Sequence, residues 1–244
     1  MILRSSRRAN FDRIARAYRW LEYLSLGTAL EKVRLHHLRS LTALPLAGKR
    51  ALILGDGDGR FTARLLRAQP LLRVDVVDSS AAMLALLWRR CHQAGGGEQS
   101  LEVHHTDALA FVAASPRTHS LDLVVSHFFL DCLHQDEVER LIDTLSPRFS
   151  PRAVWLVSEF RIPAGLLHWP ARLYVRALYF AFRVLTGLDV HRLPNYAEPL
   201  GRAGFRPVSV HRALLGLLTT ELWQCDRAAE QRTQEIPPLP AATP

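Results

Sequence analysis

The chain has 244 residues, of which 48% are hydrophobic, enough to bury a complete core in one α/β domain with modest additions. Its formal net charge is +8 and its pI about 10.1, a balance that ordinarily suggests nucleic acid or an anionic membrane as a partner. The basic residues are nearly all arginines spread along the chain, with Lys32 and Lys49 as the only lysines. Charge alone is therefore weak evidence for a polyanionic partner.

The cysteines and the apolar segments limit the compartment. Cys91, Cys132 and Cys225 lie far apart and form no CxxC pair, so neither a zinc site nor a disulfide framework is indicated. Residues 1–8 carry three arginines without the long apolar run of a secretory signal, and no stretch reaches the roughly 18 apolar residues of a membrane span. We expect a cytoplasmic protein, at most peripheral to the inner face of a membrane.

The predicted elements begin with two helices over residues 10–43, the first with apolar residues at helical spacing. Strands and helices then alternate. Strands are expected over 50–55, 72–78, 101–105, 121–127 and 153–159, and helices near 60–69, 80–93, 107–114 and 135–146. This alternation predicts right-handed crossovers and a parallel sheet. Two further strands, 205–211 and 214–224, could form an antiparallel hairpin, and the proline-rich tail after Cys225 is expected to be disordered.

The most informative motif follows the first expected strand, where the apolar run 50–54 breaks into Gly55, Gly57 and Gly59. Glycines at alternate positions allow a sharp turn and a close approach of the backbone to a ligand. A helix begins directly after them, and α/β sheets bind nucleotide-like ligands at such a junction. The second strand ends in Asp78, whose carboxylate can accept hydrogen bonds from both hydroxyls of a ribose.

The spacing of this motif discriminates between cofactors. A dinucleotide site requires its third glycine where Arg60 stands. Asp56 and Asp58 would repel a pyrophosphate but tolerate a cation. S-adenosylmethionine carries a sulfonium and an ammonium beside a ribose, so the loop suits that cofactor better than NAD.

At this point the chain resembles the class I S-adenosylmethionine-dependent methyltransferases, over roughly residues 10–224. The glycine motif of that family matches 54–59, its ribose ligand matches Asp78, its adenine-edge acid matches Asp107, and its fourth-strand motif matches 121–133. The opening Asn10–Tyr18 is similar to the ubiquinone/menaquinone-type branch, where this helix folds over the cofactor. Expected cofactor contacts are Tyr18, Gly55, Asp56, Gly57, Gly59, Asp78, Ser79, Met83, Asp107, Ala108 and His127.

The resemblance implies a Rossmann-like, seven-stranded, mostly parallel sheet with a C-terminal antiparallel hairpin, helices on both faces and an N-terminal helical cap. The corresponding domains are a cap at 1–45, a methyltransferase domain at 46–225 with a lid insertion at about 164–195, and a tail at 226–244. One departure concerns the acid that the family usually places two residues before the first glycine, where this chain has Ile53. Contacts to the methionine ammonium then pass to Asp56 or to backbone carbonyls.

Residues 166–188 form the least generic segment. On a helix, Arg172, Arg176 and Arg183 fall within roughly 40° of one another at 100° per residue. Three readings are open: a cap helix packed on the sheet, a lid over an apolar substrate pocket, or a basic amphipathic helix that docks on a membrane surface. The opposite side carries Tyr174, Leu178, Phe182 and Leu185.

Methyl transfer is an in-line displacement, so the protein mainly holds the nucleophile against the methyl group in a dry site. The loops after the fourth and fifth strands would face that group. His127 is a candidate general base, with a cap on the cofactor pocket as the structural alternative. Asp131 and Glu159 could bind a substrate ammonium or support His127, and Arg161 could instead form an ion pair with a buried carboxylate.

We therefore expect a methyltransferase acting on a small, apolar or aromatic acceptor, with a noncatalytic cofactor-binding or partner-binding protein of the same fold as the alternative. No nucleic-acid partner is expected, because the chain lacks an Asn/Asp-Pro-Pro-Tyr/Phe motif, and no Tyr-x-x-x-Lys pair supports a nicotinamide enzyme. No metal site is expected. The pairs His36–His37 and His104–His105 point to different faces and have no acidic or sulfur ligands at useful spacing. Nothing in the sequence fixes an oligomeric state.

Overall fold

The computed structural model describes residues 26, 28–95, 100–115, 120–186, 190 and 192–226. The strands are β1 (Arg50–Leu54), β2 (Arg73–Asp78), β3 (Leu101–His105), β4 (Leu121–His127), β5 (Phe149–Phe160), β6 (Phe205–Ala213) and β7 (Leu218–Cys225). The α-helices are α2 (Ala29–Leu35), α3 (Leu38–Thr42), α4 (Arg60–Ala68), α5 (Ala81–Gln93), α6 (Ala108–Ala114), α7 (Gln135–Leu145), α8 (His168–Thr186) and α9 (Ala197–Arg202).

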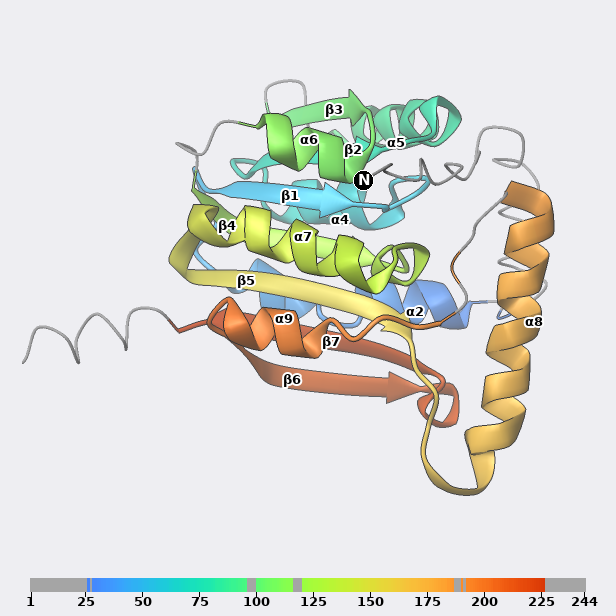
Figure 1. The fold of residues 1–244 in the computed structure, drawn as a ribbon. Coiled ribbons are helices and arrows are strands. Elements are labelled where there is room, and N and C mark those ends of the chain that lie inside the picture. Colours follow the sequence, from blue (N-terminus) through green and yellow to red (C-terminus); the bar gives the residue numbers. More distant parts are fainter. Residues whose placement is uncertain are drawn as a thin grey trace, which may run out of the picture.

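The strands form one seven-stranded sheet in the order β3-β2-β1-β4-β5-β7-β6. The first five strands along the chain pair in parallel, whereas β7 lies antiparallel to both β5 and β6 (Figure 1). The order reverses direction at β1, the first strand, which places β1 and β4 at the centre. The expected Rossmann-like sheet with a C-terminal hairpin is confirmed.

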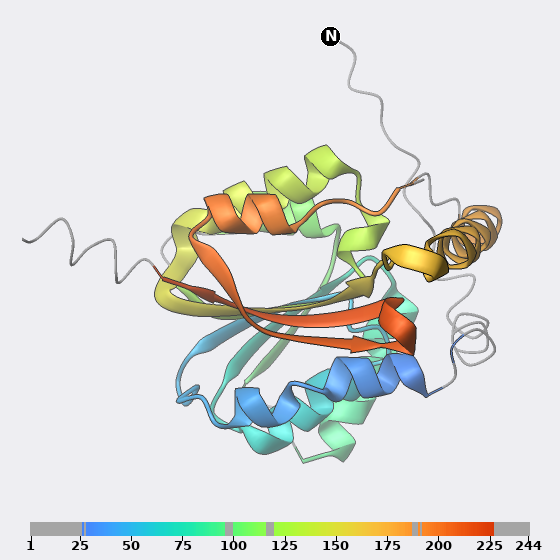
Figure 2. The ribbon, with the colours of Figure 1, turned by 90° about the horizontal axis from the view of Figure 1, so that it is seen from below.

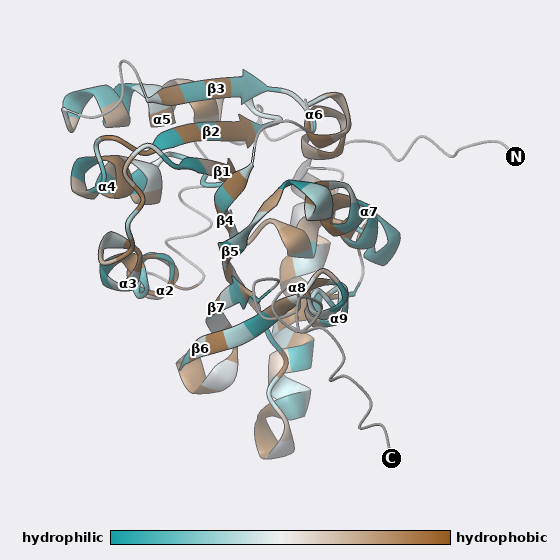
Figure 3. Ribbon diagram, turned by 90° about the vertical axis from the view of Figure 1, so that its left-hand side faces the viewer, coloured by the Kyte–Doolittle hydropathy of each residue, from teal (hydrophilic) through white to brown (hydrophobic). Residues whose placement is uncertain are grey.

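Helices cover both faces of the sheet because the central strands carry apolar side chains on both faces. Leu52 of β1 and Val124 of β4 enter the cluster under α6, α7 and α9, while Ile53 and Val125 enter the cluster under α3, α4 and α5. Figures 2 and 3 show α2–α5 on one side of the sheet and α6, α7 and α9 on the other. Strands buried on both faces have near-continuous apolar sequences, which explains why they were predictable.

Three boundaries differ from expectation. The fifth strand begins at Phe149 instead of 153, because Phe149 pairs with Leu121 before the register shifts. The hairpin turn occupies Leu214–Gly216, where a strand was expected to begin, and Leu214 and Leu215 have positive φ values of 48° and 56°. The second N-terminal helix is split into α2 and α3. The first expected helix, which includes Tyr18, lies outside the described residues.

Helix α8 runs across the edge of the sheet at which the parallel strands end (Figure 1). That edge, the carboxyl edge, is where open α/β sheets bind ligands. Val175 is buried on the inner side of α8, and Arg172, Arg176 and Arg183 are exposed on the outer side. Within the described ranges, no helix combines the length and the apolar character that crossing a bilayer requires.

Candidate functional site

The turn after β1 brings the glycine motif to the carboxyl edge. Gly55, Gly57 and Gly59 all have positive φ values, of 69°, 64° and 78°. A Cβ at Gly55 would lie 2.9 Å from Cβ of Phe129, and one at Gly59 would lie 2.7 Å from Cα of Leu87. A Cβ at Gly57 would meet no protein atom within 4 Å. Two glycines therefore serve packing, whereas Gly57 borders open space that a ligand can approach.

The two acids of this turn face inward. Asp56 is buried, and its Oδ2 accepts hydrogen bonds from the Thr62 backbone N–H at 2.9 Å and the Thr62 hydroxyl at 2.6 Å. Burial raises the pKa of Asp56 to about 6. Asp58 forms ion pairs with Arg60 at 3.2 Å and Arg90 at 2.9 Å. The expectation that these acids would repel a pyrophosphate is therefore not supported, and the argument against NAD is left with the glycine spacing.

The position of Asp56 also bears on the methionine ammonium. Its Oδ2 is committed to the first turn of α4, its Oδ1 is buried, and Ile53 is fully buried in the core. Of the two routes expected for the ammonium contact, backbone carbonyls of the glycine turn fit this arrangement better than the Asp56 side chain. Asp56 then shapes the turn.

The end of β2 carries the expected ribose ligand. Asp78 is partly buried, and its Oδ1 accepts a hydrogen bond from the Ser80 backbone N–H at 2.8 Å. Ser80 in turn caps α5 by accepting from the Met83 N–H at 3.3 Å, and Met83 is buried. Ser79 is exposed, and its carbonyl oxygen accepts a hydrogen bond from His105 Nε2 at 3.1 Å. The carboxylate of Asp78 is thus held at the edge by the start of α5.

Asp107 occupies the corresponding position after β3. It is the N-cap of α6, where its Oδ1 accepts a hydrogen bond from the Ala110 N–H at 3.0 Å. Ala108 packs in the core below it. The capping interpretation is therefore realised, and it is compatible with a second contact to a ligand, since a carboxylate has further lone pairs.

His127, the last residue of β4, is enclosed. Its Nδ1 is 2.9 Å from the Ser158 hydroxyl, which donates to Thr220 Oγ1 at 2.8 Å, and its ring packs edge-on against Phe61 at 4.6 Å. Burial first, then the charge of Arg34, lowers the pKa of His127 well below 6.5. The ring is neutral at physiological pH. This geometry favours a structural role over general-base chemistry.

Asp131 and Glu159 come together behind the loop that follows β4. Glu159 Oε1 accepts hydrogen bonds from the backbone N–H groups of Phe129 at 3.2 Å and Leu130 at 2.8 Å, and the Cys132 thiol donates to Asp131 Oδ1 at 3.5 Å. Burial raises the pKa of Asp131 to about 6. Burial and repulsion by Asp131 raise the pKa of Glu159 well above its usual range. The pair therefore retains a proton near neutral pH.

Arg161 was expected as a possible ion-pair partner for a buried carboxylate, and the described residues show no such ion pair. Arg161 is exposed, and backbone N–H groups serve Glu159 instead. The nearby cation is Arg34 of α2, a residue that sequence reasoning missed. It is buried, lies 5.3 Å from the centre of the Phe128 ring, and its charge acts on both Asp56 and Asp131. A basic residue on the apolar face of α2 is the sequence feature from which a buried Arg34 could have been predicted.

Helix α8 reaches the acid pair through Tyr179. The Tyr179 hydroxyl donates a hydrogen bond to the backbone carbonyl of Asp131 at 2.9 Å. Tyr174 and Leu178, two of the four residues expected on the inner side, are partly buried. The side chains of Phe182 and Leu185 lie outside the described part of the chain. The inner side of α8 thus closes over the ends of β4 and β5.

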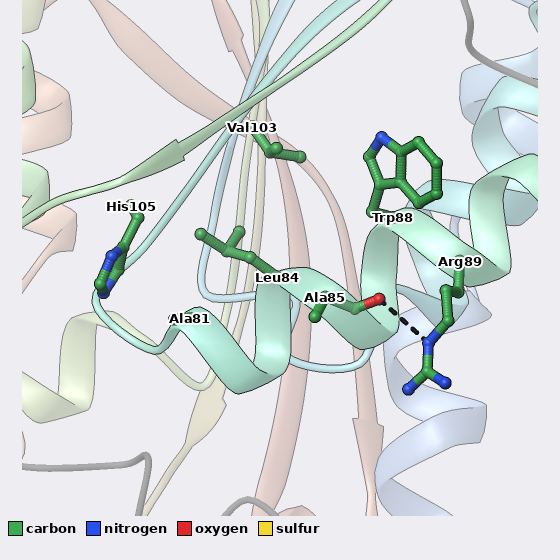
Figure 4. A pocket seen from close by; sticks show the side chains of 7 residues that line it. All are labelled: Ala81, Leu84, Ala85, Trp88, Arg89, Val103 and His105. Carbon is green, nitrogen blue, oxygen red and sulfur yellow. Dashed lines mark hydrogen bonds between the residues drawn. The ribbon is translucent and has the colours of Figure 1, made fainter.

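A shallow groove runs along α5 and β3 (Figure 4). Its surface is mainly apolar, and Gly57, Asp78 and Asp107 are not among its lining residues. The groove is therefore lined by neither the glycine turn nor the acid pair. Its lining residues are Ala81, Leu84, Ala85, Trp88, Arg89, Val103 and His105.

The histidine pairs behave differently from one another. His36 stacks on His211 at 3.7 Å, which uses its ring in packing. His104 does gain acidic neighbours that its spacing did not predict, because strand pairing brings Asp75 and Glu102 together with it, their ligand atoms within 4.8 Å of one another. Asp75 bonds His104 at 2.9 Å and lies 3.9 Å from Arg50. The positively charged Arg50 therefore already lies beside the acidic side of this cluster.

The chain is similar to known proteins in part of its sequence and in its fold. Residues 51–151 match the protein family described as a methyltransferase domain. A search of curated proteins gave no match. The mitomycin 7-O-methyltransferase is similar at a TM-score of 0.60 and 18% identity, over 88% of this chain and 60% of that one. The chain thus spans about three fifths of the length of that relative.

Two further structures show the same fold. An O-methyltransferase family 2 protein from Planctomyces limnophilus, in complex with apigenin, has a TM-score of 0.59 and 18% identity over 86% of this chain and 61% of that one. The N-methyltransferase NodS from Bradyrhizobium japonicum, in complex with S-adenosyl-L-homocysteine, has a TM-score of 0.55 and 16% identity over 80% of this chain and 87% of that one. The match to the methyltransferase-domain family thus covers residues 51–151, fewer than half of the residues of the chain, and the three solved structures share its Rossmann-like fold.

Proposed function

We propose that this protein transfers a methyl group from S-adenosylmethionine to a small, apolar or aromatic acceptor. The observation that carries the proposal is the carboxyl edge, where Gly57 borders open space and Asp78 ends the neighbouring strand. The acid pair and α8 stand at the same edge, beyond β4. The edge thus offers one place for a cofactor and another for an acceptor.

The residues present fit the cofactor. Its ribose would be held by Asp78, its adenine edge by Asp107, and its methionine part by the backbone of the turn around Gly57. When bound, S-adenosylmethionine supplies an electrophilic methyl group. The turn is fixed before binding by the bonds from Asp56 to Thr62, so little ordering cost falls on the ligand.

The acceptor would lie between the loop after β4 and the inner side of α8. Tyr174 and Leu178 give this side an apolar and aromatic surface. Asp131 and Glu159 retain a proton between them, so they can orient a hydroxyl or an amine as well as a cation. We assign His127 to the wall of the site, where its neutral ring packs against Phe61 and contacts Ser158.

The neighbours favour oxygen as the acceptor atom. Two of the similar proteins are named as O-methyltransferases, and one of them was crystallised with apigenin. The similarity of Asn10–Tyr18 to the ubiquinone/menaquinone-type branch supports a cyclic hydroxyl compound as substrate and leaves the acceptor atom open. That segment lies outside the described residues, so the branch depends on the sequence alone.

The test has two stages. Calorimetric titration of the full chain with S-adenosylmethionine and S-adenosylhomocysteine is expected to show binding of both. Transfer of a radiolabelled methyl group is then measured over a panel of phenols, quinols and aromatic amines. Labelled phenols or quinols would support the proposal, and labelled amines alone would overturn the assignment of oxygen. Binding without transfer to any acceptor, even in a metabolite extract, would favour the noncatalytic alternative.

A further inference from the structure

The outer side of α8 combines exposed apolar and basic residues. Trp169, Leu173, Phe180 and Val184 are exposed, at 73%, 70%, 68% and 68%. At 100° per residue these four residues occupy an arc of roughly 60°, and the three arginines of the helix occupy the adjacent roughly 40°. Isolated exposed apolar residues are common, but a continuous stripe of large ones marks an interaction surface.

A second exposed apolar element lies at the start of α8. The β6–β7 turn presents Leu215, which is 80% exposed, and Leu166 precedes the helix at 98%. The turn is attached to the segment that leads into α8, because the Arg161 N–H donates to the Leu217 carbonyl at 2.8 Å. Figures 1 and 2 both show the turn beside the start of α8.

The charge around this surface has one sign. Residues 161–186 contain arginines at 161, 172, 176 and 183, and neither aspartate nor glutamate. Residues 205–218, which include the turn, also lack both acids and contribute the exposed Arg212. Arg172 lies 5.6 Å from the centre of the Trp169 ring, so the basic and apolar arcs are in contact.

We propose that the outer side of α8, together with the Leu214–Leu215 turn, docks the protein on an anionic lipid bilayer. Large apolar side chains enter the interface, and arginines extend from the edge of the stripe to lipid phosphates. A second copy of the chain fits this surface less well, since a two-fold contact would place arginine against arginine with no carboxylate between them.

The docking proposal does not depend on methyl transfer, but it has a consequence for it. The inner side of α8 contacts the acid pair through Tyr179, so a bilayer on the outer side would lie one helix away from the proposed acceptor site. An acceptor dissolved in the membrane would then have a short path to the carboxyl edge.

The test is flotation of the full chain with vesicles of phosphatidylcholine, alone or mixed equally with phosphatidylglycerol. Binding to the anionic vesicles only, and weakening with salt, is expected. The double variant Leu173→Glu/Phe180→Glu is expected to lose binding. The matched control Leu71→Glu changes a residue that is 68% exposed in the loop before β2, and should retain it. Equal behaviour of the two variants would overturn the proposal.

The arginines are tested separately. Replacing Arg172, Arg176 and Arg183 by Gln is expected to weaken binding about fivefold for each, hence about a hundredfold together. The control replaces Arg67, Arg73 and Arg152, three exposed arginines near the opposite edge, and removes the same net charge. An equal loss in both triple variants would show nonspecific attraction and contradict a defined surface.

Two further measurements separate the remaining occupants. Trp169 fluorescence should be quenched by brominated lipids, and Trp169→Phe should abolish that quenching while Trp88→Phe leaves it. Sedimentation velocity without vesicles should give a species that the Leu173→Glu/Phe180→Glu change does not alter. A dimer lost in that variant, or binding to polyglutamate in place of vesicles, would overturn the proposal in favour of a protein partner.

Discussion

The cofactor side and the α8 side of the carboxyl edge are built in different ways. The cofactor side consists mainly of backbone: three glycines with positive φ and two helix starts capped by Ser80 and Asp107. The α8 side consists of side chains on a long helix, on which Val175 is buried and Tyr179 donates a hydrogen bond to the Asp131 carbonyl. The first arrangement can bind one common ligand, whereas the second can change with the acceptor.

The family match follows the same division. It covers 51–151, from β1 into the start of β5, and ends before α8. The comparison therefore predicts that changes on the cofactor side alter affinity for the cofactor, and that changes on the α8 side leave that affinity intact. The variants below test this division, from the largest expected effect to the smallest.

Gly57→Val should reduce affinity for S-adenosylmethionine below what calorimetry detects. The new side chain would enter the space beside the turn, where a Cβ meets no protein atom. The control is Gly48→Val, because Gly48 has a φ of 71° and also meets nothing within 4 Å, so it shares the backbone strain. If both variants lose binding equally, strain explains the loss and the map of the site is wrong.

Asp56→Asn should change stability and leave cofactor affinity nearly unchanged. The pKa of Asp56 is raised to about 6 in the folded chain, so the fold prefers the protonated form and wild-type stability falls as pH rises from about 4 to about 6. An asparagine does not ionise. Relative to wild type, the variant should therefore gain about 2 to 3 kcal/mol between pH 4 and pH 7.

Urea unfolding at several pH values measures this difference. The comparison with wild type at each pH removes the contribution of His127, whose lowered pKa acts in the opposite direction. A strong loss of cofactor affinity in Asp56→Asn would show that this carboxylate, and not the backbone, binds the methionine part.

Asp78→Ala should weaken cofactor binding by roughly 1 to 3 kcal/mol, the cost of leaving ribose hydroxyls without a charged acceptor. Asp136→Ala, on the exposed start of α7, is the control for loss of one carboxylate. Calorimetry with S-adenosylhomocysteine gives both affinities. Unchanged affinity in Asp78→Ala would contradict its assignment to the ribose.

Local pattern was sufficient to predict the sheet and the turn. A strand such as β4 is buried along most of its length, and glycines at alternate positions are visible without any partner. The direction of Asp56 was not predictable, because it depends on Thr62 being placed to donate two hydrogen bonds. The cluster around His104 was missed for a similar reason, since Asp75 reaches it only through strand register.

The acceptor side was less accessible to sequence reasoning because its contacts join distant segments. Arg34 and Asp131 are far apart in the sequence. No local sequence pattern around either residue predicts that the two interact. The exposed arginines of α8 were predicted from periodicity. The exposed apolar residues beside them were not, because the sequence reasoning assigned only the arginines and the apolar residues opposite them to faces of this helix.

Tyr179→Phe gives the smallest effect and the sharpest division between the two sides. Loss of the bond to the Asp131 carbonyl should lower stability by about 0.5 to 1.5 kcal/mol, since the carbonyl is left without that donor. The same variant should raise KM for the acceptor and leave the affinity for S-adenosylmethionine within about twofold, because the bond positions α8 and not the glycine turn. Steady-state kinetics with calorimetry on one preparation measure both quantities. Equal losses in acceptor and cofactor binding would show that the edge responds as one unit, and the proposed division between backbone and side-chain sites would fail.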